Sequence, residues 1–267
     1  MYKKLWLTFW GILVWVCPLM AQELYVNTEP ASNMAAKSLG IRLENQGYFK
    51  PDFKNRTTFE LMYGVNKNLM VHGTLCASDY YQAKQHFEGV SAYAKYRFYS
   101  VDSIQRHFRM AAFAKVASIN NRTPNQEIAL EGDNSGIQGG LVATQLLHKL
   151  ALSGTLSYLR AFENRGGYEP VNHNSVAYTL SAGYLLFPKK YTNYEQTNIN
   201  LYAEVLGKTN PGKGQYYLDI APAVQFIFNS NLRVDLSYRT PLTNRMVRNT
   251  QNMYLVRLEY NLFNIFN

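Results

Sequence analysis

The fold of this chain is decided by its last stretch of alternating residues, Met253-Tyr254-Leu255-Val256-Arg257-Leu258-Glu259-Tyr260-Asn261-Leu262-Phe263. From Tyr254 onward every second side chain is large and apolar, whereas Arg257, Glu259 and Asn261 between them are polar or charged. This two-residue period is typical of a β-strand whose two faces meet different surroundings. The stretch fits a soluble sandwich and a membrane barrel equally well, so the rest of the chain has to decide between them.

The first residues have the composition of an export signal. Lys3 and Lys4 precede an apolar run from Leu5 to Cys17, and Ala21 supplies a small residue at a cleavage point. The run is shorter than the roughly 20 residues that a membrane-spanning helix needs, so a membrane anchor is the less favoured alternative. We predict three parts: a signal peptide over residues 1–21, an N-terminal periplasmic or lumenal segment over residues 22–37, and an outer-membrane barrel over residues 38–267.

Cysteine and charge content narrow the class of protein. Removal of the leader would leave Cys76 as the single cysteine, so no intramolecular disulfide would form in the exported chain. The formal charge of +9 would fall to +7 with the loss of Lys3 and Lys4. We expect anionic lipopolysaccharide or an anionic solute, and no nucleic acid, as the partner of this charge. After residue 21 there is no run of 18 apolar residues, which excludes ordinary transmembrane helices.

Alternation of apolar and polar residues recurs along the chain in about twelve segments, beginning at Leu39–Glu44. Connections after even-numbered segments are mostly short, such as Asn66–Asn68 and Asn229–Asn231, whereas Ile119–Ser135 and Thr240–Asn252 follow odd-numbered segments and are long. Outer-membrane barrels show this asymmetry between periplasmic turns and outer loops. We therefore predict an all-β fold, a transmembrane antiparallel up-and-down β-barrel of about 12 strands, monomeric and located in the bacterial outer membrane.

The polar faces of these segments would line the lumen of the barrel. The predicted lumen-lining residues are Arg42, Glu44, Glu60, His72, Lys95, Arg97, Arg109, Lys115, Glu204, Asp219, Arg233, Asp235, Arg239, Arg257 and Glu259. The same alternation places Tyr99 on the inner face. Positive and negative residues are interspersed on this face. Two arrangements are therefore compatible with the sequence: a network of ion pairs that fills the lumen, or a polar path that attracts anions. Near the barrel closure, where the last strand would meet Arg42 and Glu44, local pairing is favoured.

We predict no catalytic residues, no cofactor and no metal site. The five histidines are scattered, and none has the spacing of a metal ligand pair. The tripeptide His173-Asn174-Ser175 weakly resembles the Ser/His/Asn grouping of outer-membrane phospholipases, but no Gly-x-Ser-x-Gly elbow accompanies it. An outer-membrane lipid hydrolase is therefore the least favoured function.

Two stretches resemble a known family. Thr57–Leu69 reads as a strand, Tyr-Gly, a polar turn and a second strand, and Gly89–Phe98 is a glycine-led strand that contains Lys-Tyr-Arg. Both are similar to segments of the outer-membrane transporters named after the meta pathway of phenol degradation, in barrels of the Bacteroidetes type. The resemblance implies export or uptake of small compounds, hydrophobic ones included, without identifying a ligand. The strongly charged inner face departs from a path for hydrophobic compounds.

The preferred functional hypothesis is an outer-membrane barrel that passes or binds a small-molecule solute. The alternative is a structural or surface-interaction barrel whose lumen is plugged and whose long loops carry the activity. The expected partners are outer-membrane lipid, lipopolysaccharide and the barrel assembly machinery, because the aromatic end at Tyr260–Phe266 resembles the C-terminal signal of barrel substrates.

Overall fold

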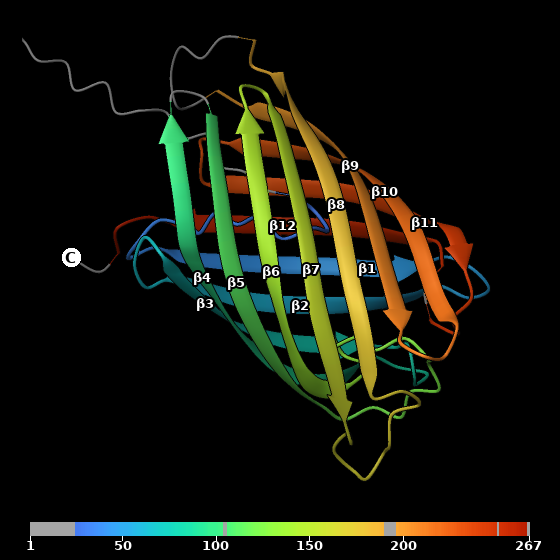
Figure 1. Cartoon of the computed structure of the whole chain (residues 1–267). Coiled ribbons are helices and arrows are strands. Elements are labelled where there is room, and N and C mark those ends of the chain that lie inside the picture. The colour runs from blue at the N-terminus through green and yellow to red at the C-terminus, as the bar shows by residue number, and fades with distance from the viewer. Residues whose placement is uncertain (1–24, 104–105, 190–195, 250, 266–267) are drawn as a thin grey trace, which may run out of the picture.

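The computed structural model describes residues 25–103, 106–189, 196–249 and 251–265. The predicted signal peptide lies outside these residues. The described chain forms twelve strands (Figure 1), namely β1 (Leu39–Tyr48), β2 (Lys54–Gly64), β3 (Leu69–Ser78), β4 (His86–Ser103), β5 (Arg106–Ile119), β6 (Ser135–Leu147), β7 (Leu150–Phe162), β8 (Asn174–Phe187), β9 (Asn198–Asn210), β10 (Gln215–Phe228), β11 (Leu232–Asn244) and β12 (Met253–Leu262). None of the described residues forms a helix long and apolar enough to cross a membrane.

The twelve strands make one closed antiparallel sheet. Each strand pairs with its neighbours along the chain, and β1 closes the barrel by pairing with β12, which sets Arg42 opposite Glu259 and Glu44 opposite Arg257. Closure leaves no strand edge unpaired, which is the condition for a sheet that stands in hydrocarbon. The prediction of an all-β, up-and-down barrel of about 12 strands is confirmed.

The two faces of the barrel differ as the alternation predicts. On β12, Val256, Leu258 and Tyr260 are exposed on the outside, whereas Arg257 and Glu259 are buried on the inside. The same pattern recurs on the other strands, so the outer surface is predominantly large and apolar. A face of this kind would be unfavourable in water and is suited to lipid.

The prediction that Tyr99 lies on the inner face is wrong. The pairing of β4 with β5 shifts its register between Arg97 and Tyr99, so one additional residue, Phe98, is accommodated on β4. Such a bulge reverses the side of every residue beyond it. Tyr99 is therefore exposed on the outer face, where its ring lies 6.0 Å from that of Phe108.

The predicted loop Thr240–Asn252 is shorter than expected, because β11 continues to Asn244. Pro241 pairs with Asp219 next to a register shift between β10 and β11, and a proline is tolerated at such a bulge. Most of the long connections follow odd-numbered strands and gather at one end of the barrel (Figure 1), but the connection between β8 and β9, residues 188–197, follows an even-numbered strand and is also long. The strand β10 also accommodates Pro222, at a point where the ladder to β11 is interrupted.

Candidate functional site

Ten of the fifteen predicted lumen-lining residues line two cavities inside the barrel. Those that line the larger of two lumenal cavities are Arg42, Glu44, Glu60, Lys115, Arg239 and Arg257. Those that line the smaller one include His72, Lys95, Arg233 and Glu259. Four more of the predicted residues make hydrogen bonds to other groups inside the barrel: Arg109, Glu204, Asp219 and Asp235. Arg97 lies at the rim, where it donates to the carbonyl of Lys67 in the β2–β3 turn.

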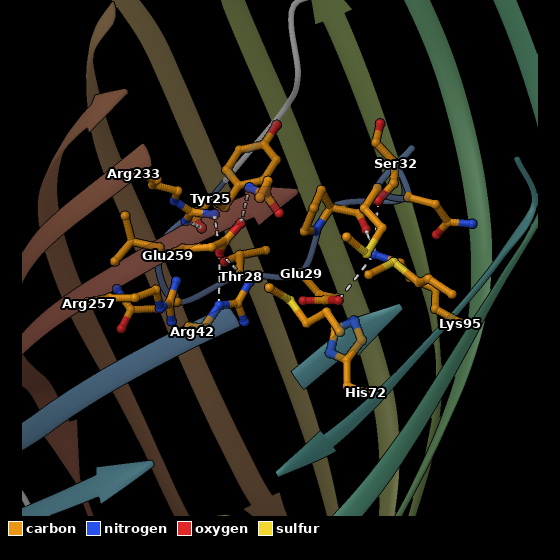
Figure 2. Close-up of a pocket in the computed structure, with 18 residues that line it drawn as sticks. Tyr25, Thr28, Glu29, Ser32, Arg42, His72, Lys95, Arg233, Arg257 and Glu259 are labelled. Atoms are coloured by element: carbon orange, nitrogen blue, oxygen red, sulfur yellow. Dashed lines mark hydrogen bonds and ion pairs between the residues drawn. The ribbon is translucent and has the colours of Figure 1, made fainter. Parts of the chain in front are cut away.

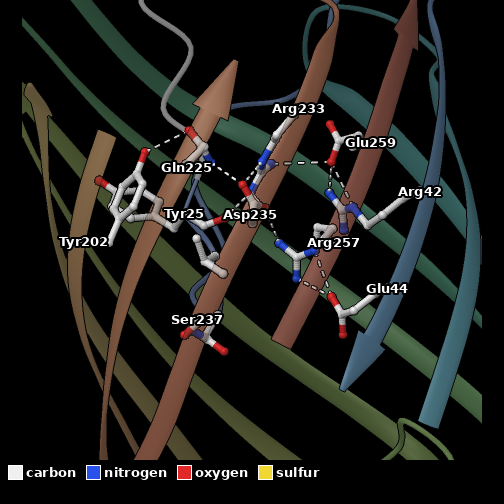
Figure 3. A network of polar contacts seen from close by, with 12 residues as sticks. Tyr25, Arg42, Glu44, Tyr202, Gln225, Arg233, Asp235, Ser237, Arg257 and Glu259 are labelled. Atoms are coloured by element: carbon white, nitrogen blue, oxygen red, sulfur yellow. Dashed lines mark hydrogen bonds and ion pairs between the residues drawn. The ribbon is translucent and has the colours of Figure 1, made fainter. Parts of the chain in front are cut away.

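A continuous network of ion pairs crosses the closure of the barrel (Figure 3). It runs in the order Glu60, Arg42, Glu259, Arg233, Asp235, Arg257 and Glu44. The N–O distances along it range from 2.5 Å at Arg257–Glu44 to 3.4 Å at Arg233–Glu259. Because each buried cation has an acidic partner on either side, the charges stay compensated away from bulk water. The network brings β1, β2, β11 and β12 together from the inside.

The residues that precede β1, 25–38, enter the barrel with residues 25–34, and we call the whole stretch the lumenal segment. Glu204 on β9 accepts hydrogen bonds from the backbone N–H of Val26 at 3.2 Å and of Asn27 at 2.5 Å. The Asn27 side-chain amide and the Ser181 hydroxyl also donate to it, at 2.7 and 3.0 Å. Glu204 is fully buried, so these donors replace the water that its carboxyl group would otherwise bind.

On the opposite wall Lys95 of β4 holds the same segment (Figure 2). Its ammonium group donates to the carbonyls of Pro30 and Ser32 at 2.7 and 3.0 Å and to the carboxylate of Glu29 at 3.1 Å. Arg109 of β5 donates to the Ser32 hydroxyl at 2.8 Å. All three protons of the buried ammonium group thus have acceptors on the lumenal segment.

Further wall contacts also involve main-chain atoms of the segment. Arg233 donates to the Tyr25 carbonyl at 2.6 Å, and the Thr144 hydroxyl accepts the Ala31 N–H at 2.9 Å. An extended segment inside a barrel has no strand partner for its backbone, so wall side chains have to satisfy those groups. The lumenal segment is therefore docked mainly through its backbone.

The connection between β5 and β6, residues 120–134, also folds into the barrel, from the end where the long loops gather, and we call it the inward loop. Three of its carboxylates pair with wall cations: Glu127 with Lys208 at 2.9 Å, Glu131 with Lys115 at 2.6 Å, and Asp133 with Arg56 at 2.6 Å. Ile128 and Leu130 of the loop are buried in a cluster with Ile119 and Leu159. Apolar packing and ion pairs together keep the loop inside.

The inward loop's carboxylates differ in acidity. Burial would raise the pKa of Glu127, but the positive charge of Lys208 lowers it to about 2. Enclosure inside the barrel would raise the pKa of Glu131, but the positive charge of Lys115 lowers it to about 2, although this side chain is 48% exposed. Burial raises the pKa of Asp133 above its ordinary value despite its contact with a guanidinium group. Glu127 and Glu131 are therefore ionised at neutral pH.

The connection between β11 and β12, residues 245–252, contributes a further cation. Arg248 makes two hydrogen bonds to Asp219, at 2.5 and 2.6 Å, and Arg239 makes another at 2.5 Å. The guanidinium carbon of Arg248 lies 4.0 Å from the centre of the Tyr217 ring, a cation–π contact. Asp219 is fully buried between the two arginines.

Between the lumenal segment and the inward loop lies a cavity of about 320 Å³, which we call the central cavity. The cations that line it are Arg42, Arg56, Lys115, Lys208, Arg239 and Arg257. The anions that line it are Glu44, Glu60, Glu127, Glu131 and Asp133. A space of this size with charges of both signs suits a small polar solute better than an apolar one.

Several charged lumenal residues were not predicted from the sequence. Arg56 and Lys208 stand in phase with Glu60 and Glu204 on their strands, so extending the alternation by four residues would have found them. The carboxylates of the inward loop carried no such signal, because a loop has no side-chain period.

The tripeptide His173-Asn174-Ser175 does not form a catalytic grouping. The Ser175 hydroxyl donates to the Thr209 carbonyl at 3.0 Å, and Asn174 accepts from the hydroxyl of Tyr158. The imidazole Nδ1 of His173 lies 3.4 Å from the Ala161 carbonyl oxygen. No hydrogen bond joins the serine to the histidine, as nucleophilic catalysis would require. Among the described residues, no group of three or more His, Cys, Asp and Glu side chains is placed to hold a metal ion.

The barrel is similar to solved porin structures. The KdgM porin matches with a TM-score of 0.51 and 14% identity, over 84% of this chain and 98% of that one. The fold is that of a porin. The KdgM porin in complex with disordered oligogalacturonate matches with a TM-score of 0.50 and 12% identity, over the same shares of the two chains. No protein-family model matches this chain, and no curated protein sequence matches it. The likeness to porins therefore rests on the arrangement of the strands and not on sequence similarity.

Proposed function

We propose that this protein is an outer-membrane channel that passes or binds a small polar solute. The observation that carries the proposal is the central cavity, which is lined by charges of both signs and lies between two inserted pieces of chain. Both pieces are held by hydrogen bonds, ion pairs and apolar contacts, so they can move without breaking a covalent bond. A lumen of this construction selects by size and charge.

The position in the membrane follows from the outer face. Large apolar side chains such as Leu156, Leu180 and Leu242 are about 60% exposed there, which requires a hydrocarbon environment. We further propose that residues 1–21 are removed as a signal peptide, that the assembly machinery inserts the barrel as a monomer, and that lipopolysaccharide surrounds its outer end.

The resemblance to transporters of the phenol-degradation pathway remains part of this proposal in a restricted form. Transport of a small compound agrees with the central cavity. A hydrophobic cargo does not, because desolvating the lining charges against an apolar molecule would be costly. We propose a polar or charged solute instead, and no enzymatic activity.

The second candidate function is a structural or surface-interaction barrel with a permanently plugged lumen. The ion-pair network at the closure and the buried contacts of Lys95 and Glu204 favour it, because they fill much of the lumen. In this case the outer connections would make the functional contacts.

Planar-bilayer recordings with the purified protein test the two candidates. A channel gives solute-dependent conductance steps, and charged solutes that enter the central cavity reduce them. A lumen that stays closed at all voltages and for all solutes would contradict the channel and leave the plugged barrel. Liposome swelling with neutral and charged solutes of increasing size provides an independent measurement.

A further inference from the structure

A smaller cavity of about 120 Å³, next to the lumenal segment, contains a set of sulfur donors. It is lined by Met34 of the segment, Met62 of β2, Met70 of β3 and His72 of β3; the sulfur atoms are yellow in Figure 2. The three methionines are buried and pack together in one cluster. Three thioethers and one imidazole therefore face one enclosed space.

The strand register brings these side chains together. Met62 lies directly opposite His72 in the β2–β3 ladder, and Met70 is two residues before His72 on the same face. The ends of Met34 and Met62 lie close together above Gly40, where an added Cβ would meet their methyl groups at 3.4 and 2.6 Å. Gly40 thus leaves the room that the methionines occupy.

His72 is oriented as a ligand would be. Its Nδ1 lies 3.2 Å from a carboxylate oxygen of Glu60, while its Nε2 is buried and has no hydrogen-bond partner among the described residues. The side chain is only 6% exposed. A histidine whose Nδ1 is held by a carboxylate presents the lone pair of Nε2 to a metal, which is the usual arrangement behind metal-binding histidines.

We propose that Met34, Met62, Met70 and His72 form a binding site for a soft monovalent cation, Cu(I) or its heavier congener Ag(I). Thioether sulfur is a soft donor that selects Cu(I), whereas Mg²⁺ and Ca²⁺ require oxygen ligands. All four ligands are neutral, which suits an ion with a single charge. Thioethers supply three of the four donors, so the site contains a single histidine and no cysteine or carboxylate ligand.

The electrostatic surroundings can accept one more positive charge. The other cations that line this cavity, Lys95, Arg42, Arg233 and Arg257, are already compensated. Lys95 has Glu29 and two backbone carbonyls, and each arginine has two acidic partners. Glu60, which also pairs with Arg42, lies behind His72 and places a carboxylate next to the site. Cys76, the single thiol of the described residues, lines the central cavity instead and is not part of this site.

The site joins two parts of the molecule. Met34 belongs to the lumenal segment, whereas the other ligands stand on β2 and β3. A bound ion would connect the segment to the wall at Met34, which now packs against Met62 and Met70. Ag(I) should therefore slow amide hydrogen exchange in residues 31–37, in addition to occupying the cavity.

The test is an Ag(I) titration of the full, detergent-solubilised protein, carried out in a Cys76→Ser background so that no thiol competes. We expect one equivalent of Ag(I) to bind, measured by equilibrium dialysis with metal analysis, and to remain bound in excess Zn²⁺. Replacing Met62 and Met70 together by leucine should weaken binding at least about tenfold, and Glu60→Gln by about tenfold through the orientation of His72. X-ray absorption of the Cu(I) form should show sulfur and nitrogen neighbours.

The matched control is Met246→Leu, because Met246 is a buried methionine of the β11–β12 connection, away from this cavity. It should leave Ag(I) affinity unchanged. Met34→Leu lies outside the strands, so it tests the site without disturbing barrel assembly, and it should weaken binding and abolish the slowed exchange. Undiminished Ag(I) binding by the Met34, Met62 and Met70 leucine variants would overturn the proposal. These are binding measurements, so their outcome is independent of whether the barrel conducts solutes.

Discussion

The lumenal segment and the inward loop both occupy the lumen, but the wall holds them by different chemistry. Lys95 and Glu204 bind main-chain groups of the segment, so most of its anchoring is independent of its own side chains. The inward loop is held through its own carboxylates, such as Glu127 on Lys208, and through apolar side chains. One insertion is therefore fixed mainly by recognition of its backbone, and the other by its ionised and apolar side chains.

The lumenal segment and the inward loop should respond differently to mutation and to pH. Docking of the segment should tolerate changes in its sequence and fail when a wall residue such as Lys95 is removed. Docking of the loop should depend mainly on the ionisation of the buried Glu127, and hence on pH. Changes to the segment, to the wall and to the loop should therefore have separable effects.

The largest effect is expected from deleting residues 25–36. Removing the lumenal segment opens the space it fills, so single-channel conductance in planar bilayers should increase several-fold. Replacing residues 25–32 by glycine and serine of equal length should restore much of the closure, because the wall binds backbone groups. Heat-dependent migration on gels provides the check that both variants assemble as barrels. Equal conductance of the deletion variant and the parent protein would contradict a plug role for the segment.

Lys95→Leu should release the segment without removing it. The change leaves the Pro30 and Ser32 carbonyls and the Glu29 carboxylate without their buried donor, and hydrogen bonds to charged groups contribute about 1.5–3 kcal/mol each. We expect segment docking to weaken by roughly 3 kcal/mol, seen as faster amide hydrogen exchange in residues 26–34. The control, Lys84→Leu, removes an exposed lysine and should change nothing. Unchanged exchange in the Lys95 variant would show that other contacts suffice.

Lys208→Leu should weaken the docking of the inward loop. Glu127 then remains buried with only the Tyr217 hydroxyl as a donor, and the Ile128 carbonyl loses its partner. We expect exchange in residues 124–131 to accelerate by an amount that corresponds to about 2 kcal/mol, while the lumenal segment keeps its protection. A parallel loss of protection in both insertions would argue that they form one cooperative unit.

Acid should loosen the inward loop. The pKa of Glu127 is lowered from 4.5 to about 2, so its contribution is fully present above pH 4.5 and is lost as the pH falls toward 2. Its shift corresponds to about 3 kcal/mol. Asp133 acts in the opposite sense, because its pKa is raised and its protonation in acid relieves a burial cost. Exchange or proteolysis of residues 120–134 at decreasing pH provides the measurement, and Glu127→Gln should make the loop less sensitive to acid.

Glu131→Gln should have the smallest effect. The Glu131 side chain is 48% exposed, so water screens its pair with Lys115 despite the N–O distance of 2.6 Å. We expect a change within about 1 kcal/mol in loop docking and unchanged conductance. A loss comparable to that of Lys208→Leu would show that Glu131 acts together with the buried pairs rather than as a surface contact.

Most of the fold could be predicted because the side chains of a strand alternate between its two faces, so apolar and polar residues recur with a period of two. That period located β12 and the other strands, and it placed Arg257 and Glu259 on the face that proves to be inside. It failed at Tyr99, because a bulge changes the phase without changing composition. Bulges depend on the pairing strand, so one segment alone does not reveal them.

The candidate site was less accessible to prediction. The cations of the wall could be found by alternation, but their partners Glu127 and Asp133 lie in a loop that has no period. The methionine cluster was equally hidden, because Met34 belongs to an irregular segment and meets Met62 and Met70 only inside the closed barrel.

The sequence by itself determined the class of structure: alternating strands with one apolar face, short and long connections in turn, and a charged inner face. The tertiary structure decided which charges meet and what fills the lumen. Contacts such as Lys95 with Ser32 and Arg56 with Asp133 join residues far apart in the chain. They arise when closure brings opposite walls within reach of one inserted segment, a condition that depends on the geometry of the whole barrel and on no local pattern.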